Sequence, residues 1–202
     1  MVALMLPVLV GLGVWQLQRA EWKEAMLADL AANSARPVAA PAPGAPLSGY
    51  RFRRVVLLLA CEPPPPVVSA GRSLAGQPGY AVLVPCRRAD PIDDPDSRVL
   101  LAIGWGPRPD SWKAASAAWP PAAGHRVEGV LVERSGEPRW LLVARAAAAP
   151  LEPSAPPTPE TIPNNHRSYA IQWFSFAGIL AIVYAAFVRR WRRNLAAAPP
   201  GR

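Results

Sequence analysis

The residues best able to do chemistry in this chain lie in one short segment, PNNHRSYAIQWF, at 163–174. His166, Tyr169 and Trp173 recur at positions i, i+3 and i+7, so a helix over this segment places all three on one face. A neutral imidazole is a common ligand of haem iron, and flanking aromatic rings suit a flat porphyrin. The same residues also fit an aromatic belt at a membrane boundary. Spacing alone favours the belt interpretation.

The two cysteines, Cys61 and Cys86, are the next candidates. A disulfide between them is chemically permitted outside the cytoplasm. Both lie within or beside apolar runs, where a free cysteine often packs as a small hydrophobic residue, and we expect this second arrangement. The sequence contains no C-x-x-C, which argues against a thiol-based metal chaperone or redox protein.

Two further kinds of site are weakly supported. The acidic segment DPIDDPDS lacks the spaced glycine and distal glutamate of a calcium-binding EF-hand. A solvated turn is therefore the better interpretation of its aspartates, Asp90, Asp93, Asp94 and Asp96. Nucleophilic catalysis needs a base, yet no G-x-S-x-G occurs and no nucleophile is placed near His125 or His166 by sequence. We therefore expect that the protein is not an enzyme.

The positive charge of the chain is concentrated at one end. The chain has 202 residues and a net charge of +8, but residues 19–167 hold 17 Lys/Arg against 14 Asp/Glu. The other five positive charges follow the last apolar run, at Arg189, Arg190, Arg192, Arg193 and Arg202. Such a tail marks the cytoplasmic side of a membrane segment. We expect no nucleic-acid binding, because no basic stripe interleaves with aromatic residues in the central region.

The apolar run before this tail predicts a transmembrane helix. Residues 168–188 contain no charge, and 21 residues suffice to cross a hydrocarbon core of roughly 30 Å. Tyr169 and Trp173 lie at one end, and Tyr184 and Trp191 lie near the other, as interfacial anchors do. Residues 189–202 then form a basic cytoplasmic tail.

The N-terminal residues 1–18 also carry no side-chain charge, and they predict a first transmembrane helix. As a helix they reach about 27 Å, and the helical pattern continues to about residue 32. A cleaved signal peptide is the alternative, but a basic n-region and a nearby small-residue cleavage site are lacking. Two spans place both termini in the cytoplasm. The central region then faces the periplasm, in a two-pass protein of the bacterial inner membrane.

The central region predicts a β-rich domain. Short runs rich in β-forming residues, bounded by glycine and proline, occupy 50–145 and suggest an antiparallel sheet or a small open barrel. A Pro/Ala-rich connector at 33–49 precedes this domain, and a Pro/Ala-rich linker at 146–163 follows it. The fold class is thus an α+β membrane protein with two helices flanking a β-rich extracytoplasmic domain.

Three stretches together carry a family resemblance. They are LGVWQLQRAEWK at 12–23, GYAVLVP with VLLAIGWGP at 79–85 and 99–107, and PNNHRSYAIQWF at 163–174. In this order, and bracketed by two apolar helices, they resemble the Surfeit-locus family of cytochrome c oxidase assembly factors, as a divergent bacterial member. The resemblance spans nearly the whole chain, and its last motif is the most specific.

The resemblance implies a non-enzymatic role. Family members assist the maturation of cytochrome c oxidase subunit I, and bacterial members are linked to the binding and delivery of haem a. His166 then matches the candidate axial ligand of the haem iron. The implied cofactor-binding residues are His166, Tyr169, Trp173, Trp15 and Gln16. The implied motif and packing residues are Gly13, Leu17, Arg19, Trp22, Lys23, Asn164, Asn165, Gly104 and Trp105.

One departure from the family pattern concerns its Asn-Arg-Gly-Trp strand. This chain has Ala102 and Ile103 before Gly104 and Trp105, so the arginine is lost. The alternative function is a haem-free membrane scaffold that binds nascent oxidase subunits or other assembly factors. There the signature residues only pack the two helices.

Overall fold

The computed structural model describes residues 2–63, 65–89, 97–120, 124–159 and 162–196. The acidic segment with Asp90, Asp93, Asp94 and Asp96, interpreted above as a turn, lies outside the described residues. The chain divides into two compact units. One comprises Met1–Leu27 with Pro163–Arg202, and the other comprises Ala28–Ile162. We describe each unit by itself.

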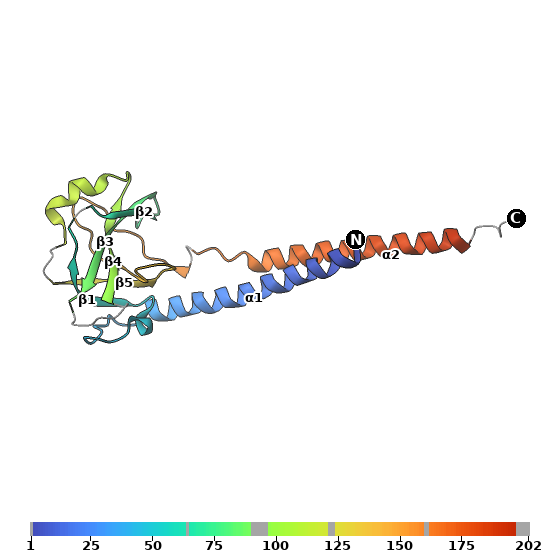
Figure 1. Ribbon diagram of the computed structural model, residues 1–202, viewed down its shortest axis with the longest axis horizontal. Helices are drawn as coiled ribbons and strands as arrows, with labels where there is room; N and C mark the ends of the chain where they lie inside the picture. The colour runs from blue at the N-terminus through green and yellow to red at the C-terminus, as the bar shows by residue number, and fades with distance from the viewer. Residues whose placement is uncertain (1, 64, 90–96, 121–123, 160–161, 197–202) are drawn as a thin grey trace. The chain divides into compact units, whose positions relative to one another are not determined.

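The first unit is built from two long helices. Helix α1 spans Val2–Ser34 and helix α2 spans His166–Ala196 (Figure 1). The two helices are antiparallel, because Gly13 of α1 lies against Phe174 of α2 while Gln16, further along α1, contacts His166 at the start of α2. α1 contains Pro7, which has no backbone N–H and so leaves one hydrogen bond of the helix unmade.

One helix of the described residues, over His166–Asn194, is long and apolar enough to cross a membrane by length and composition. This range contains the segment 168–188 predicted as a membrane helix. The predicted first span at 1–18 does not reach this standard among the described residues, so a two-span architecture is not confirmed.

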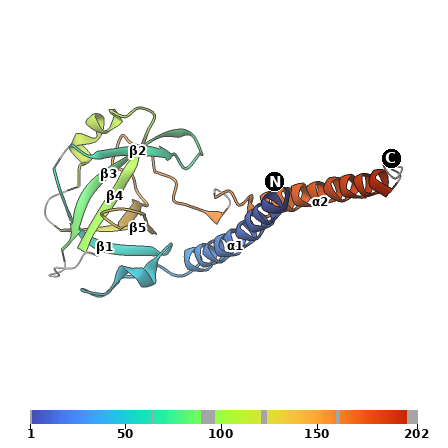
Figure 2. The same ribbon diagram turned by 45° about the vertical axis from the view of Figure 1, so that its right-hand side comes forward.

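The second unit is a small β-barrel. Its sheet has the strand order β1-β5-β6-β4-β3-β2, and β1 also pairs with β3, which closes the sheet on itself. The strands are β1 Arg54–Cys61, β2 Val67–Arg72, β3 Pro78–Arg88, β4 Arg98–Gly106, β5 His125–Glu133 and β6 Trp140–Ala144. A 3-10 helix, η3 Ser111–Ala118, lies between β4 and β5. In both views β3 and β4 lie side by side (Figure 2).

The structure corrects two details of the predicted sheet. The barrel is closed rather than open, since β1 and β3 pair through Leu59↔Arg88 and Cys61↔Cys86. The β4–β6 pair is parallel, whereas the remaining strand pairs are antiparallel. Local patterns could not give either feature, because both depend on pairings between strands that are distant in the sequence.

The barrel core follows from alternation along the strands. In β1 the buried positions alternate with exposed or half-buried positions, as expected of a strand with one face toward a core. The core includes the fully buried Trp140 of β6, packed with Leu131 and Leu142. A smaller cluster, Leu83, Leu100, Ala102 and Val143, uses the intervening positions of β3, β4 and β6.

The two Pro/Ala-rich segments are bonded to the barrel, unlike the connector and linker predicted from their composition. In the first, Ala39 pairs with Val55 of β1, and Leu47 of the 3-10 helix η1 (Leu47–Tyr50) is fully buried. In the second, the backbone groups of Glu152 and Trp105 exchange two hydrogen bonds, and Leu151 is buried. Composition gave no sign of these contacts, because they use backbone groups that alanine supplies as well as any residue.

Cys61 and Cys86 form a disulfide, which corrects the expectation that both pack as free thiols. They stand directly opposite each other where β1 and β3 close the barrel. Their apolar surroundings are real, since both residues are buried in the core. The bond therefore cross-links the barrel at its closing pair of strands.

Candidate functional site

The start of α2 positions the candidate histidine. His166 is the first residue of the helix, and the backbone N–H of Tyr169 donates to the carbonyl of Asn165 at 3.1 Å. Asn165 therefore occupies the N-cap position, where asparagine is among the preferred residues. Asn164 is half-buried, and its Oδ1 has no hydrogen-bond partner among the residues that the structure describes.

The structure brings His166 and Gln16 together across 150 residues of sequence. The Nδ1 atom of His166 lies 2.8 Å from Oε1 of Gln16, and the contact is part-buried. Both residues were implied as cofactor-binding by the family resemblance. Their hydrogen bond joins the motif at 12–23 on α1, called the first signature, to the motif at 163–174 that opens α2, called the second signature.

An ion pair stands beside this hydrogen bond. Arg167, the residue after His166, reaches Glu24 of α1 through two parallel contacts, Nε to Oε1 and Nη2 to Oε2, each at 2.8 Å. Such a bidentate pair fixes orientation as well as adding attraction. Sequence reasoning did not single out Arg167 or Glu24, and the available signal was only that Arg167 lies within the second signature.

Small residues let the two helices approach closely. A Cβ added to Gly13 would lie 2.6 Å from the ring of Phe174, so a side chain at this position would require the ring to move. Ala20 on α1 and Ala170 and Ala177 on α2 are buried. We call the small residues Gly13, Ala20, Ala170 and Ala177, together with the Phe174 ring that lies against Gly13, the small-residue seam. Its alanines were missed from the sequence, although Gly13 and Ala20, like Ala170 and Ala177, recur at i and i+7.

Aromatic side chains follow His166 on α2 and flank Gln16 on α1. Tyr169 is exposed one turn further along α2, and Trp173 packs edge-on against Phe176 with 6.1 Å between ring centroids. Trp15 of α1, next to Gln16, is more than half exposed. Exposed aromatic rings on a helix with an apolar run can face lipid or a flat ligand.

The remaining signature residues of α1 lie on its more exposed positions. The guanidinium of Arg19 sits 4.0 Å from the ring centroid of Trp22, a cation–π contact. Leu17 and Trp22 are exposed, while Lys23 is half-buried. These residues were implied as packing residues, and the contact between Arg19 and Trp22 is within α1 itself.

Gly104 and Trp105 belong to the barrel unit rather than to the helix pair. Gly104 has φ +157°, and a Cβ there would lie 2.6 Å from Cβ of Leu151. The buried Trp105 covers Gly79, where an added Cβ would meet the indole at 2.5 Å. This part of the family pattern therefore serves barrel packing, with glycine required at both contacts.

The residues at the start of α2 offer one imidazole as a ligand for a haem iron. Within the described ranges no cluster of three His, Cys, Asp or Glu side chains could hold a metal ion. His166 offers one half-buried imidazole, and Tyr169 lies exposed on the following turn. A single imidazole suffices for a porphyrin-held iron, because the macrocycle already supplies the four equatorial nitrogens. The donor chemistry of the site therefore fits the haem implied by the resemblance.

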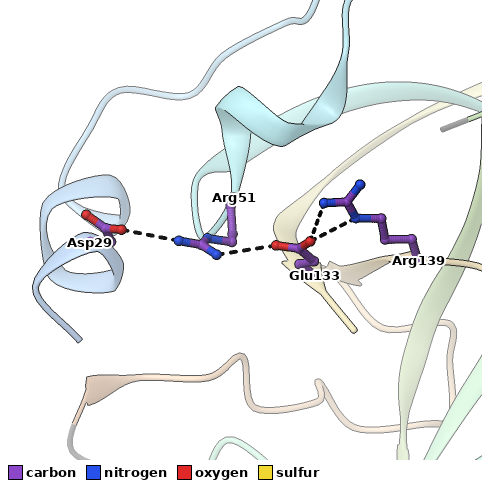
Figure 3. Close-up of polar contacts among 4 residues, drawn as sticks. All are labelled: Asp29, Arg51, Glu133 and Arg139. Carbon is purple, nitrogen blue, oxygen red and sulfur yellow. Dashed lines mark hydrogen bonds and ion pairs between the residues drawn. The ribbon is translucent and has the colours of Figure 1, made fainter. Parts of the chain in front are cut away.

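A second polar cluster lies in the barrel unit (Figure 3). Arg51 reaches Asp29 at 3.2 Å and Glu133 of β5 at 3.3 Å, and Arg139 donates to the same Glu133 carboxylate from Nε at 2.8 Å. The hydrogen bond from Arg139, followed by the nearby positive charges of Arg139 and Arg51, holds the pKa of Glu133 below its ordinary value of 4.5. This chain of charges ties Arg51, which follows η1, and the end of α1 to the strand β5.

The comparisons with known proteins agree with this distribution of motifs. Residues 3–178 match the model of the SURF1 family. The chain belongs to the SURF1 family. A SURF1-like protein of Monosiga brevicollis is 27% identical over 238 residues, which cover 95% of this chain and 88% of that protein. The resemblance to the Surfeit-locus family is confirmed.

Membership of the SURF1 family sets the broad function. SURF1 proteins are oxidase assembly factors rather than a family of catalytic enzymes. The matched residues include the α1 signature, the barrel and the first half of α2, so the family relationship does not depend on one motif. The candidate membrane helix over His166–Asn194 is consistent with assembly of a membrane-bound oxidase.

Proposed function

We propose that this SURF1 protein assists the insertion of haem a into cytochrome c oxidase subunit I, with His166 as the axial ligand that holds the haem transiently. The observation that carries the proposal is the hydrogen bond between His166 and Gln16 at 2.8 Å, which joins the two most distant family signatures. Tyr169 and Trp173 follow His166 on α2, and Trp15 precedes Gln16 on α1, so aromatic side chains are available on both helices.

The proposed role suits a site with one protein ligand. Delivery requires that the haem leave again, so moderate affinity is more useful than permanent attachment. A single imidazole can exchange for a histidine of the receiving subunit, whereas a pair of strong axial ligands would slow release. The half-buried position of His166 is compatible with both binding and release.

We also propose a two-pass topology in the bacterial inner membrane, with both termini cytoplasmic and the barrel in the periplasm. The arginines that follow the apolar part of α2 support a cytoplasmic C-terminus. The Cys61–Cys86 disulfide supports an oxidising compartment for the barrel. Cysteine labelling from each side of the membrane tests this arrangement.

The proposed haem site is tested with the two histidines of the chain. His166→Ala should abolish the haem absorbance of protein purified from cells that make haem a. His125→Ala is the matched control, because His125 lies in β5 of the barrel and should leave the absorbance unchanged. An unchanged spectrum for His166→Ala would refute His166 as the ligand.

A haem-free scaffold is the second candidate function. The observation in its favour is that signature residues also pack the helix pair, since Gly13 lies against Phe174 and Arg167 pairs with Glu24. In this case the protein would bind nascent oxidase subunits or other assembly factors. Co-purification separates the two functions, because the scaffold predicts oxidase partners without pigment.

A further inference from the structure

We infer that Gln16 is a positioning residue that fixes His166 in one tautomer and so leaves the Nε2 lone pair free to bind an iron. The inference deepens the proposed function, because the iron is that of the haem proposed above. Its first half, the choice of tautomer, concerns only the protein and can be tested without haem.

The tautomer follows from the chemistry of the contact. The atom 2.8 Å from His166 Nδ1 is the amide oxygen of Gln16, and a carbonyl oxygen can only accept a hydrogen bond. With the Gln16 amide in this orientation, Nδ1 carries the hydrogen and donates it. A neutral imidazole has one N–H, so Nε2 is left with its lone pair, which is the form that binds a metal.

The packing of the helix pair holds this contact in place. Gln16 lies three residues after Gly13 and four before Ala20, so all three share one face of α1. His166 lies four residues before the buried Ala170. The seam and the Arg167–Glu24 pair therefore fix the two helices around the hydrogen bond.

The acceptor for the His166 N–H is a neutral amide, and this sets how basic the imidazole is. Metal-binding histidines commonly donate their second N–H to a carboxylate, a carbonyl or water, and this partner orients the ring and raises its basicity. A carboxylate would add negative charge and bind the imidazole N–H more strongly, whereas the neutral Gln16 orients the ring with less increase in basicity. The site thus combines a fixed geometry with an exchangeable ligand.

The tautomer is measured in the full-length, haem-free protein in detergent by nitrogen NMR of labelled histidine. We expect the Nδ1–H form of His166 in the wild type and in Gln16→Glu, which keeps an acceptor oxygen. Gln16→Leu should move the population toward the Nε2–H form. Gln18→Leu is the matched control, because Gln18 is exposed on the same helix and should leave the tautomer unchanged.

The effect on the ligand is measured by titrating the same variants with haem a. Gln16→Leu should weaken binding by about 10–100-fold, the range typical for the loss of a residue that orients a metal ligand. Gln16→Glu should restore binding and lower the reduction potential of the bound haem relative to the wild type, because a more basic imidazole favours the oxidised iron. Gln18→Leu should bind as the wild type does.

Two results would overturn the inference. One is an Nε2–H tautomer in the wild type, and the other is equal tautomer populations and equal haem affinity in Gln16→Leu and Gln18→Leu. Failure of the proposed function looks different: haem binding would survive His166→Ala, or the wild type itself would bind no haem. The tautomer measured without haem still decides the role of Gln16 in that case.

Discussion

The barrel and the helix pair are stabilised in contrasting ways. The barrel has a continuous hydrogen-bonded sheet, a core around Trp140 and a disulfide at its closing strands. The helix pair is held by the small-residue seam, the Gln16–His166 hydrogen bond and the Arg167–Glu24 pair. The helix pair therefore depends on close packing at a few positions and on two polar contacts.

From this contrast we expect substitutions in the barrel to alter stability and substitutions in the helix pair to alter function. Many contacts stabilise the barrel, so one substitution there should lower its stability without moving the other strands. In the helix pair a single contact fixes the ring of His166. Substitutions in the two units should therefore differ in their effect on the free energy of unfolding.

Removing the largest fully buried side chain should affect the barrel most. Trp140→Ala should lower the free energy of unfolding by about 3–5 kcal/mol, from lost burial and the cavity left behind. Urea unfolding of the full chain, followed by circular dichroism of the sheet, measures the change. Trp191→Ala is the control, because Trp191 is exposed on α2. Equal losses in the two variants would remove the contrast between the units.

The disulfide should contribute the next largest effect. Its cysteines are separated by 25 residues, so replacing both with serine should cost about 3 kcal/mol through greater freedom of the unfolded chain. Unfolding with and without a thiol reductant measures the contribution. Reductant should destabilise the wild type and leave the serine variant unchanged. A wild type insensitive to reductant, once reduction is verified by mass, would contradict the prediction.

The seam offers the corresponding test on the helix pair. Gly13→Leu should destabilise the pair by about 1–3 kcal/mol, because the new side chain collides with Phe174. Gly11→Leu is the control, since an added Cβ at Gly11 meets nothing within 4 Å. Phe174→Ala should recover part of the loss in a double-mutant cycle. Equal effects of the two leucine substitutions would argue against close packing at Gly13.

The charge cluster of the barrel should give the smallest effect. Glu133→Gln should cost about 1 kcal/mol or less, because Arg139 is half exposed and solvent screens the pair. The pKa of Glu133 is lowered in the folded state, so its contribution is present above pH 4.5 and is lost as the pH falls through the lowered pKa. Acid unfolding of wild type and Glu133→Gln should therefore converge at low pH. Exposed Glu137, changed to Gln, should show no such convergence.

The sequence predicted those parts of the molecule that depend on local periodicity. The apolar run at 168–188 indicated a long helix, and the spacing of His166, Tyr169 and Trp173 placed them on one face. The β-rich character of 50–145 followed from short runs bounded by glycine and proline. The role of Gln16 was reached only through the family resemblance, because no local pattern relates one helix to a residue 150 positions away.

The features that escaped prediction are those set by register. Apolar neighbours made free thiols the simpler expectation for Cys61 and Cys86, and only the register of β1 against β3 brings them opposite each other. The barrel closure depends on the same register. The seam was hidden for a related reason, since alanine is so abundant in this chain that Ala20, Ala170 and Ala177 did not stand out.

The order of the barrel strands also sets when the barrel can form. Strand β1 pairs with β5, although β2, β3 and β4 lie between them in the chain. The short pairing of β1 with β3 can form earlier, but the longer ladder of β1 must wait for β5, and pairings so distant in sequence slow folding. The barrel sheet is thus expected to be complete only once β6 has been made, shortly before the chain reaches α2.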